Sequence, residues 1–346
     1  MKFKAVLFVV LLFGLLAGFR LPAVADPLFQ ELTPLNIELE LELRSLCREK
    51  DRSLCEDRPG LLSYQTGAGE WRAIPVQIRS RGLWRLHKMS CTFPPLFLLF
   101  EEADVAGTLF EGQFMLPMTT HCTNRELAFR KYVLKEYLAY RLYGLFSEKN
   151  VQARLVNVSY HDPSVGKRYK PRYAFFTEHF KSVALRNDST VVEKPWVNID
   201  QFDPLEMTTL ALFQFMIGNT DWSSLACHNI TLLQSANGAL SPLPFDFDFS
   251  GLVNARYASP PPNLRIKNVR QRLYRGFCYP DMDWEMVYAT FLGKQDQVFA
   301  AVEELAAFSK RAMLESKYYI RGFYDILESP RKRQEEIEGD CRPIDQ

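Results

Sequence analysis

Residues 204–251 read PLEMTTLALFQFMIGNTDWSSLACHNITLLQSANGALSPLPFDFDFSG. The first part, Pro204–Ile217, is almost entirely apolar, which predicts a helix that is buried on all sides. A turn signal at 236–238 separates two short apolar runs, and we expect a strand on each side of it, the second over Leu240–Phe249. The polar residues of this stretch therefore follow rigid, buried elements, as side chains at functional sites often do.

These polar residues are of the types that phosphoryl transfer requires. The reaction needs a carboxylate that orients the acceptor, together with hard oxygen ligands for magnesium. Loop residues after the helix, loop residues before the first strand and residues at the end of the second strand would supply them. The candidates are Asn219, Asp221, His228, Asn229, Asp246 and Asp248.

Each candidate also has an ordinary structural interpretation. Asx residues commonly cap turns, which is the alternative for Asn219 and Asp221. Asp246 and Asp248 would share the solvated face of a strand, and His228 is equally well explained as a structural hydrogen-bonding residue. Because all of them gather in one segment after a buried helix, we favour the functional interpretation.

The order N-x-D, then N, then P-F-D-x-D resembles the CotH spore-coat kinase family and, more distantly, HipA-type and other atypical kinases. The resemblance implies an α+β, two-lobed atypical protein-kinase-like fold, with a strand-rich N-lobe that includes one long helix and a mainly helical C-lobe. It implies Mg²⁺ or Mn²⁺ and ATP or another nucleotide as cofactors. The implied roles are catalytic carboxylate for Asp221, metal ligands for Asn229, Asp246 and Asp248, and nucleotide binding for Asn219 and His228.

A weaker resemblance lies in the first half of the chain. The stretch Ile78–Arg85, IRSRGLWR, is similar to the Arg-Gly strand-turn near the start of CotH-like domains. Those domains usually carry a lysine on the next strand, whereas Cys91–Phe100 has none. Lys131 or Lys135 on the long helix would have to replace it, and we assign Lys131 to nucleotide binding.

The hydrophobic pattern predicts strands in the first half and helices in the second. We expect a signal peptide over 1–25, an N-lobe over 26–180, a C-lobe over 181–329 and a charged, disordered tail over 330–346. Residues 283–327 would supply about two helices, and Phe180–Asn198 a polar loop or hinge. The other elements we expect are strands over Asn36–Leu43, Ile74–Arg81 and Leu96–Phe100, a helix over Asn124–Phe146 capped through Thr123 and Glu126, and a hairpin of Ala153–Tyr160 with Tyr173–Glu178.

The first 25 residues have the pattern of an export signal. Lys2 and Lys4 precede an apolar run of about 15 residues, shorter than a bilayer span, and Ala23-Val24-Ala25 is a cleavage signal before Asp26. Without this segment, which also contains Arg20, the 42 basic residues become 39 against 41 acidic ones. We therefore expect an exported, periplasmic or secreted protein with no membrane span after cleavage and no nucleic-acid partner.

The seven cysteines follow the predicted signal, and an oxidising compartment would allow them to form disulfides. An odd number leaves at least one thiol unpaired, and Cys47 with Cys55 is close enough for a local bridge. No spacing fits a structural zinc site. The adjacent His121 and Cys122 are better explained by a disulfide or by packing than by a nucleophile pair, because neighbours in sequence rarely place an imidazole beside a thiol.

A basic stretch follows the proline-rich loop: Arg265, Lys267, Arg270, Arg272 and Arg275. It fits either a solvated helix face or a clamp for a phosphate or another anionic group beside the acidic site.

Three functions stay open. The first is a kinase-like phosphotransferase acting on a protein or small molecule. The second is an inactive exported pseudokinase used for binding or assembly, and a lysine or arginine within reach of the aspartates would favour the first over it. The third is another metal-dependent transferase that uses Asp246 and Asp248 as a D-x-D motif, for which a doubly wound sheet would be expected.

Overall fold

The structure is a computed structural model that describes residues 26–49, 51–82, 85, 91–124, 128–193 and 196–344. The predicted signal peptide and Glu126 of the predicted helix cap lie outside the described residues. Within the described part, no helix has the length and apolarity needed to cross a membrane.

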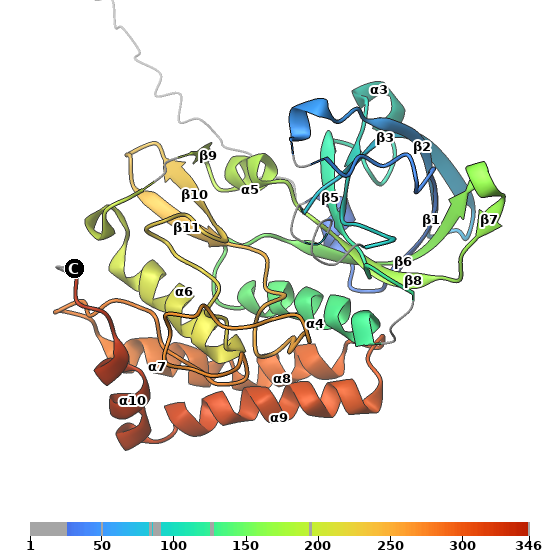
Figure 1. Ribbon diagram of the computed structural model, residues 1–346. Coiled ribbons are helices and arrows are strands. Elements are labelled where there is room, and N and C mark those ends of the chain that lie inside the picture. Colours follow the sequence, from blue (N-terminus) through green and yellow to red (C-terminus); the bar gives the residue numbers. More distant parts are fainter. Residues whose placement is uncertain are drawn as a thin grey trace, which may run out of the picture.

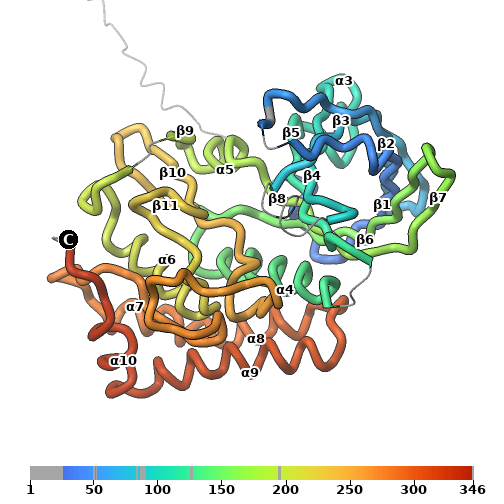
Figure 2. Tube along the Cα trace, in the orientation of Figure 1, coloured from blue at the N-terminus to red at the C-terminus, as the bar shows by residue number. Residues whose placement is uncertain are grey.

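The first half of the chain forms a closed barrel of seven strands (Figures 1 and 2). Neighbouring strands pair antiparallel in the order β1, β2, β3, β4, β5, β8 and β6, and a parallel pairing of β6 with β1 closes the ring. Closure leaves these strands without a free edge. Their bounds are β1 Leu35–Glu40, β2 Arg58–Gln65, β3 Trp71–Ser80, β4 Leu96–Leu99, β5 Met115–Thr119, β6 Ala153–Asp162 and β8 Arg172–Thr177; the short β7, Lys167–Arg168, pairs with β6 outside the ring.

Helix α4, Ala128–Tyr143, joins the barrel to the helices that follow. Alternation along β8 sends Phe176 into the core of the barrel and Phe175 toward α4, where its ring lies 5.6 Å from that of Tyr140. Figure 1 shows α4 between the barrel and the layer of α8 and α9. The strand-rich and helical halves are thus held together by two continuous apolar cores that meet at β6 and β8.

Helix α6 covers Pro204–Ile217, as predicted, and lies at the centre of the helical half. Asp203 caps its first turn, and Gly218 ends it in a left-handed conformation with φ 63°. Among the described residues, the other helices are α1 Pro27–Gln30, α3 Glu102–Val105, α5 Phe180–Arg186, α7 Trp284–Gly293, α8 Gln295–Glu303, α9 Lys310–Leu327 and α10 Pro330–Glu336, and the 3₁₀ turns are Arg52–Leu54, Pro163–Val165, Ile199–Gln201 and Glu338–Asp340.

Several sequence predictions are corrected by the structure. Residues 283–327 form three helices rather than two, because the chain turns at Lys294 as well as after Glu303. The expected loop Phe180–Asn198 contains α5 and β9, Ser189–Val192, which pairs with β10, Ile230–Ser235. Partly buried valines of β9 pack on the helical core and explain why this polar segment is ordered.

The predicted disordered tail is also wrong. Helix α10 folds back on α9, Ile337 is fully buried, and the Cys278–Cys341 disulfide fixes the end of the chain. Arg342 adds backbone hydrogen bonds to Gly276 and Cys278. Within the charged segment after Pro330, buried apolar side chains such as Ile337 and the disulfide of Cys341 hold the chain in place.

Six of the seven cysteines form disulfides. The predicted Cys47–Cys55 bridge is present, Cys91 pairs with Cys122, and Cys227 is the unpaired thiol. His121 is buried with its ring 4.7 Å from that of Phe93, and burial lowers its pKa to about 4. Both expectations for His121 and Cys122, packing and a disulfide, are therefore confirmed.

The fold is α+β with strands in the first half and helices in the second, as predicted. The closed barrel was not predicted, and the two-lobed kinase-like arrangement is not established by this architecture. Strand patterns identify the strands, but they do not tell whether the first and last strands of a sheet meet.

Candidate functional site

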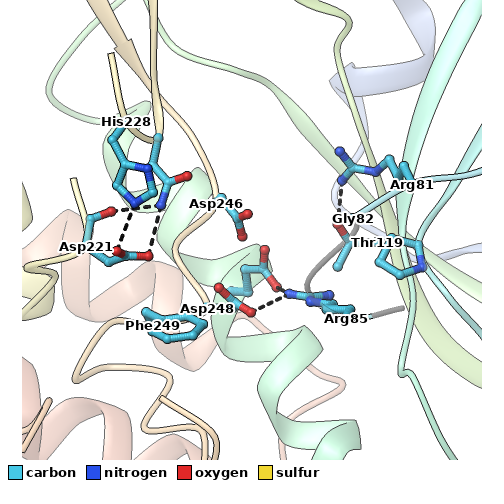
Figure 3. Close-up of a pocket in the computed structure, with 12 residues that line it drawn as sticks. Arg81, Gly82, Arg85, Thr119, Asp221, His228, Asp246, Asp248 and Phe249 are labelled. Carbon is cyan, nitrogen blue, oxygen red and sulfur yellow. Dashed lines mark hydrogen bonds and ion pairs between the residues drawn. The ribbon is translucent and has the colours of Figure 1, made fainter. Parts of the chain in front are cut away.

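A pocket of about 440 Å³ lies between the barrel and the helical half. Ends of barrel strands supply Arg81, Gly82, Pro95 and Thr119 on one side. The other side is formed by Glu136 of α4 and by two loops of the helical half, which contribute Asp221, His228, Asn229, Asp246, Asp248 and Phe249. Figure 3 shows the acidic side chains facing the arginines across this pocket.

The Asp221 loop is set by the end of α6. Asn219 is buried, accepts a hydrogen bond from the Asp221 backbone N–H (3.0 Å) and donates one to Gln214 Oε1 (3.0 Å). The indole N–H of Trp222 donates to the Asn219 carbonyl (3.2 Å). Asn219, predicted to bind nucleotide, is not among the residues that line the pocket, and it instead fixes the loop that presents Asp221.

Asp221 is held by two side chains that were predicted to belong to the site. Its Oδ1 lies 2.9 Å from Nε2 of His228, and its Oδ2 accepts from Nδ2 of Asn229 at 3.1 Å. The same amide donates to the Asp221 carbonyl at 2.8 Å. The carboxylate is therefore held in one orientation at the pocket wall, while the His228 side chain, 57% exposed, remains open to solvent.

Asp246 lies just past the end of β11, Leu240–Pro244. The strand predicted to reach Phe249 ends here because Asp246 adopts a left-handed conformation with φ 58° and donates its N–H to the Tyr140 hydroxyl (3.0 Å). Its side chain opens into the pocket, and among the described residues no hydrogen bond or ion pair reaches the carboxylate. Enclosure by the protein, together with the nearby Asp248 and Glu136, raises its pKa well above the ordinary value.

Asp248 has the opposite surroundings. It is buried, and its Oδ2 lies 2.8 Å from Nη2 of Arg85 and accepts from the Tyr257 hydroxyl at 2.9 Å. Arg85 also pairs with Glu136 of α4 at 3.0 Å, so one guanidinium serves two carboxylates (Figure 3). Burial and the negative charge of Asp248 raise the pKa of Glu136 to about 7, although the positive charge of Arg85 lowers this pKa.

The lysines considered for the nucleotide lie elsewhere. Nζ of Lys131 is 3.6 Å and Nζ of Lys135 is 3.5 Å from Glu315 on α9. Neither lines the pocket described above. The cations that do line it are Arg81 and Arg85, which sit in the IRSRGLWR stretch.

The basic stretch after the proline-rich loop is neither a helix face nor a clamp in the pocket. Arg275 donates from Nη1 to the carbonyls of Thr220 and Trp222, one on each side of Asp221. Arg270 and Arg272 stack on the ring of Tyr319, each 4.1 Å from its centroid. Arg270 donates to the Gly251 carbonyl, and Arg272 donates to the carbonyls of Met216 and Tyr319, so these guanidinium groups face backbone oxygens rather than a ligand.

A second pocket of about 250 Å³ adjoins the first and shares Arg81, Glu136 and Asp246 with it. Its remaining lining is largely apolar, and it includes the rings of Phe97, Tyr140, Phe180 and Phe245. A flat, apolar group could therefore occupy this pocket while a charged group reaches the acidic one.

Three side chains at the junction were not predicted as site residues: Arg81, Arg85 and Glu136. The two arginines belong to a stretch quoted for its resemblance to an Arg-Gly turn, and this was the available signal. No sequence signal marks Glu136 as a site residue, because a glutamate on a long helix is usually a solvated surface residue.

Metal ligation was tested against the side chains present. Within the described ranges, no three His, Cys, Asp or Glu side chains are grouped so that they could hold a metal ion. Magnesium needs fewer protein ligands, since it keeps several waters and binds phosphate oxygens. The uncompensated Asp246 carboxylate and the Asn229 amide oxygen fit that smaller requirement, whereas Asp248 already has partners.

The comparisons with known proteins leave the family open. No protein-family model and no curated protein matches this chain. Among solved structures, the chain is similar to the crystal structure of a Helicobacter pylori proinflammatory kinase, CtkA, with 12% sequence identity and a TM-score of 0.37 over 67% of this chain and 90% of that one. A TM-score this low assigns neither the fold nor the activity, and the CotH resemblance stays a prediction.

Proposed function

We propose that this protein is a kinase-like phosphotransferase that uses a divalent metal ion and a nucleotide to phosphorylate a hydroxyl group of a protein or small molecule. One observation carries the proposal: an oriented carboxylate, Asp221, and an uncompensated one, Asp246, face a single pocket that also contains two arginines. Phosphoryl transfer depends mainly on positioning and on electrostatic stabilisation, and these residues can supply both.

Asp221 would orient the acceptor hydroxyl and accept its proton. Asn229 holds the carboxylate from one side and His228 from the other, so the attacking oxygen would meet a fixed partner. The brace of Arg275 on the two neighbouring carbonyls adds to this rigidity.

Asp246 and Asn229 would hold a magnesium or manganese ion. The ion would neutralise charge on the phosphate oxygens of the bound nucleotide. Burial and the neighbouring charges of Asp248 and Glu136 raise the pKa of Asp246, and a cation bound at this carboxylate would favour its charged form.

The aromatic second pocket supports a nucleotide as the donor. A base bound among Phe97, Tyr140, Phe180 and Phe245 would leave its phosphates at the junction with the acidic pocket. Export from the cytoplasm remains part of the proposal and rests on residues 1–25 alone.

The two alternatives receive less support. Arginines within reach of the aspartates favour an active enzyme over a pseudokinase, although the pairing of Asp248 with Arg85 is what a binding protein with a disabled site would also show. A D-x-D transferase would need both acids free and a doubly wound sheet. The described strands form instead a largely antiparallel barrel and a three-stranded antiparallel sheet.

The test uses purified mature protein, γ-labelled ATP, and Mg²⁺ or Mn²⁺, with transfer to acceptor mixtures and ATP hydrolysis as readouts. Asp221→Asn should retain metal-dependent nucleotide binding and lose turnover by about 100-fold or more. Asp246→Asn should lose both. Asp281→Asn is the matched control, because Asp281 is exposed and does not line the pocket. Equal Mg-ATP binding by the wild type and Asp246→Asn would refute the proposal.

A further inference from the structure

Arg81 occupies the junction of the two pockets. It follows β3 directly, and it is one of three residues that line both the acidic and the aromatic pocket. Its backbone N–H is used by the barrel, donating to the Pro95 carbonyl at 2.8 Å. The strand end thus holds the residue firmly while its side chain reaches the site (Figure 3).

Among the described residues, Arg81 forms no direct ion pair, and the charges of Asp246 and Glu136 act on it only from a greater distance. Nη2 donates to the neutral hydroxyl of Thr119 at 3.2 Å, and the guanidinium lies 5.4 Å from the centroid of the Phe97 ring. Nε is shielded from solvent and makes no hydrogen bond. Among the described residues, no carboxylate lies within ion-pair distance of this side chain, whereas Arg85 next to it serves two.

An arginine in such a place is costly to the fold. A partly desolvated guanidinium without a direct anionic partner loses hydration free energy, and contacts with a hydroxyl and an aromatic ring offset only part of this loss. Burial accordingly lowers the pKa of Arg81, although the charge persists at any physiological pH. A desolvated charge of this kind destabilises the ligand-free protein and can stabilise a bound anion.

We propose that Arg81 is the anion-binding residue of this site and that its guanidinium binds phosphate oxygens of a polyphosphate ligand at the junction of the two pockets. The inference rests on the proposed function and names the residue that takes the place of the missing lysine. The ligand's flat portion would extend into the aromatic pocket, and its terminal phosphate would extend toward Asp221.

Neighbouring acids make the site selective for a phosphoryl group that carries a metal ion. Asp246 and Glu136 line the same two pockets as Arg81 and repel a bare anion. A polyphosphate with a bound divalent cation presents negative oxygens to Arg81 and positive charge to Asp246. Binding of tripolyphosphate should therefore depend on Mn²⁺, and binding of adenosine should not depend on Arg81.

Calorimetric titration of the full mature protein with tripolyphosphate and Mn²⁺ tests the inference. Arg81→Gln should weaken binding by about tenfold or more, since it removes a charge-assisted contact. Arg79→Gln is the matched control, because Arg79 lies in β3, two positions before Arg81, and pairs with Asp57 rather than lining either pocket. It should bind as the wild type does.

A second measurement observes binding in the wild-type protein and needs a variant only to assign one resonance. In the wild-type protein, the Arg81 Nε–H resonance should shift on titration with tripolyphosphate in the presence of diamagnetic Mg²⁺ instead of Mn²⁺. Arg81→Lys assigns that resonance by its loss. Equal affinity of Arg81→Gln and Arg79→Gln, or an Nε–H resonance that does not move, would overturn the inference.

The two proposals fail in different ways. Tripolyphosphate binding that requires Arg81, in a protein without phosphoryl-transfer activity, would support the anion site and refute the phosphotransferase. Transfer activity that survives in Arg81→Gln with unchanged nucleotide affinity would refute the anion site alone.

Discussion

Asp246 and Asp248 are two positions apart and have opposite electrostatic surroundings. Asp248 is compensated by Arg85 and Tyr257, whereas Asp246 faces the pocket with a raised pKa and a left-handed backbone. Strain and uncompensated charge at one residue are typical of a functional position, because they are retained only where they serve a purpose other than stability.

Neutralising the two aspartates should therefore shift stability in opposite directions. Asp246→Asn should stabilise the protein by about 1 kcal/mol, because it removes a buried carboxylate that Asp248 and Glu136 also repel and because asparagine tolerates the left-handed conformation. Asp248→Asn should destabilise it by about 3 kcal/mol, because it breaks a buried ion pair. Urea unfolding at pH 7 measures both, and a loss of stability in Asp246→Asn would contradict this account.

At the scale of elements, the site depends on how α6 ends. The Gly218 carbonyl accepts from the Gly251 N–H at 3.0 Å, which ties the Asp221 loop to the loop that follows Asp246 and Asp248. A Cβ on Gly218 or Gly251 would collide with the Tyr319 hydroxyl of α9. Three segments distant in sequence thus meet at two glycines, and their close approach sets the spacing of the acids.

Gly218→Ala should destabilise the protein by about 2–4 kcal/mol, from the left-handed backbone and the collision together. Gly107→Ala is the matched control: its φ of 66° is similar, but nothing lies within 4 Å of the added Cβ, so only about 1 kcal/mol should be lost. Denaturant unfolding gives both values. Combining Gly218→Ala with Tyr319→Phe should restore part of the loss, and an equal cost at both glycines would argue against the collision.

At the scale of the whole molecule, a closed barrel and a helical half share the strands β6 and β8, and the candidate site lies where they meet. The end of the chain returns to the helical half, where the Cys278–Cys341 disulfide and the buried Ile337 hold α10 in place. Stability of the site-bearing half therefore includes a contribution from the last residues of the chain.

Replacing Cys278 and Cys341 together by alanine should cost about 4 kcal/mol, since the bridge spans 63 residues. Replacing Cys47 and Cys55, which are separated by 8 residues, should cost about 2 kcal/mol less than that. Urea unfolding under non-reducing conditions compares the two double variants. A larger loss at the short bridge would show that chain entropy does not govern these disulfides.

Periodicity and composition predicted the elements whose pattern is local. The buried helix Pro204–Ile217, the Cys47–Cys55 bridge and the grouping of Asp221, His228 and Asn229 follow from short-range sequence signals. The order of the chain end was missed because the disulfide partner of Cys341 lies 63 residues away, and β9 was missed because it is stabilised by pairing with β10.

The sequence by itself determined which segment presents the acids, since a buried apolar helix followed by Asx residues and a strand turn can be recognised without its neighbours. Only the tertiary structure decided which acid is compensated and which cation lies beside it. Arg81, Arg85 and Glu136 line the same pocket as Asp246 and Asp248, although they precede these aspartates by more than 100 positions along the chain. Charge compensation acts through space over a few ångströms, so the order of residues cannot reveal it.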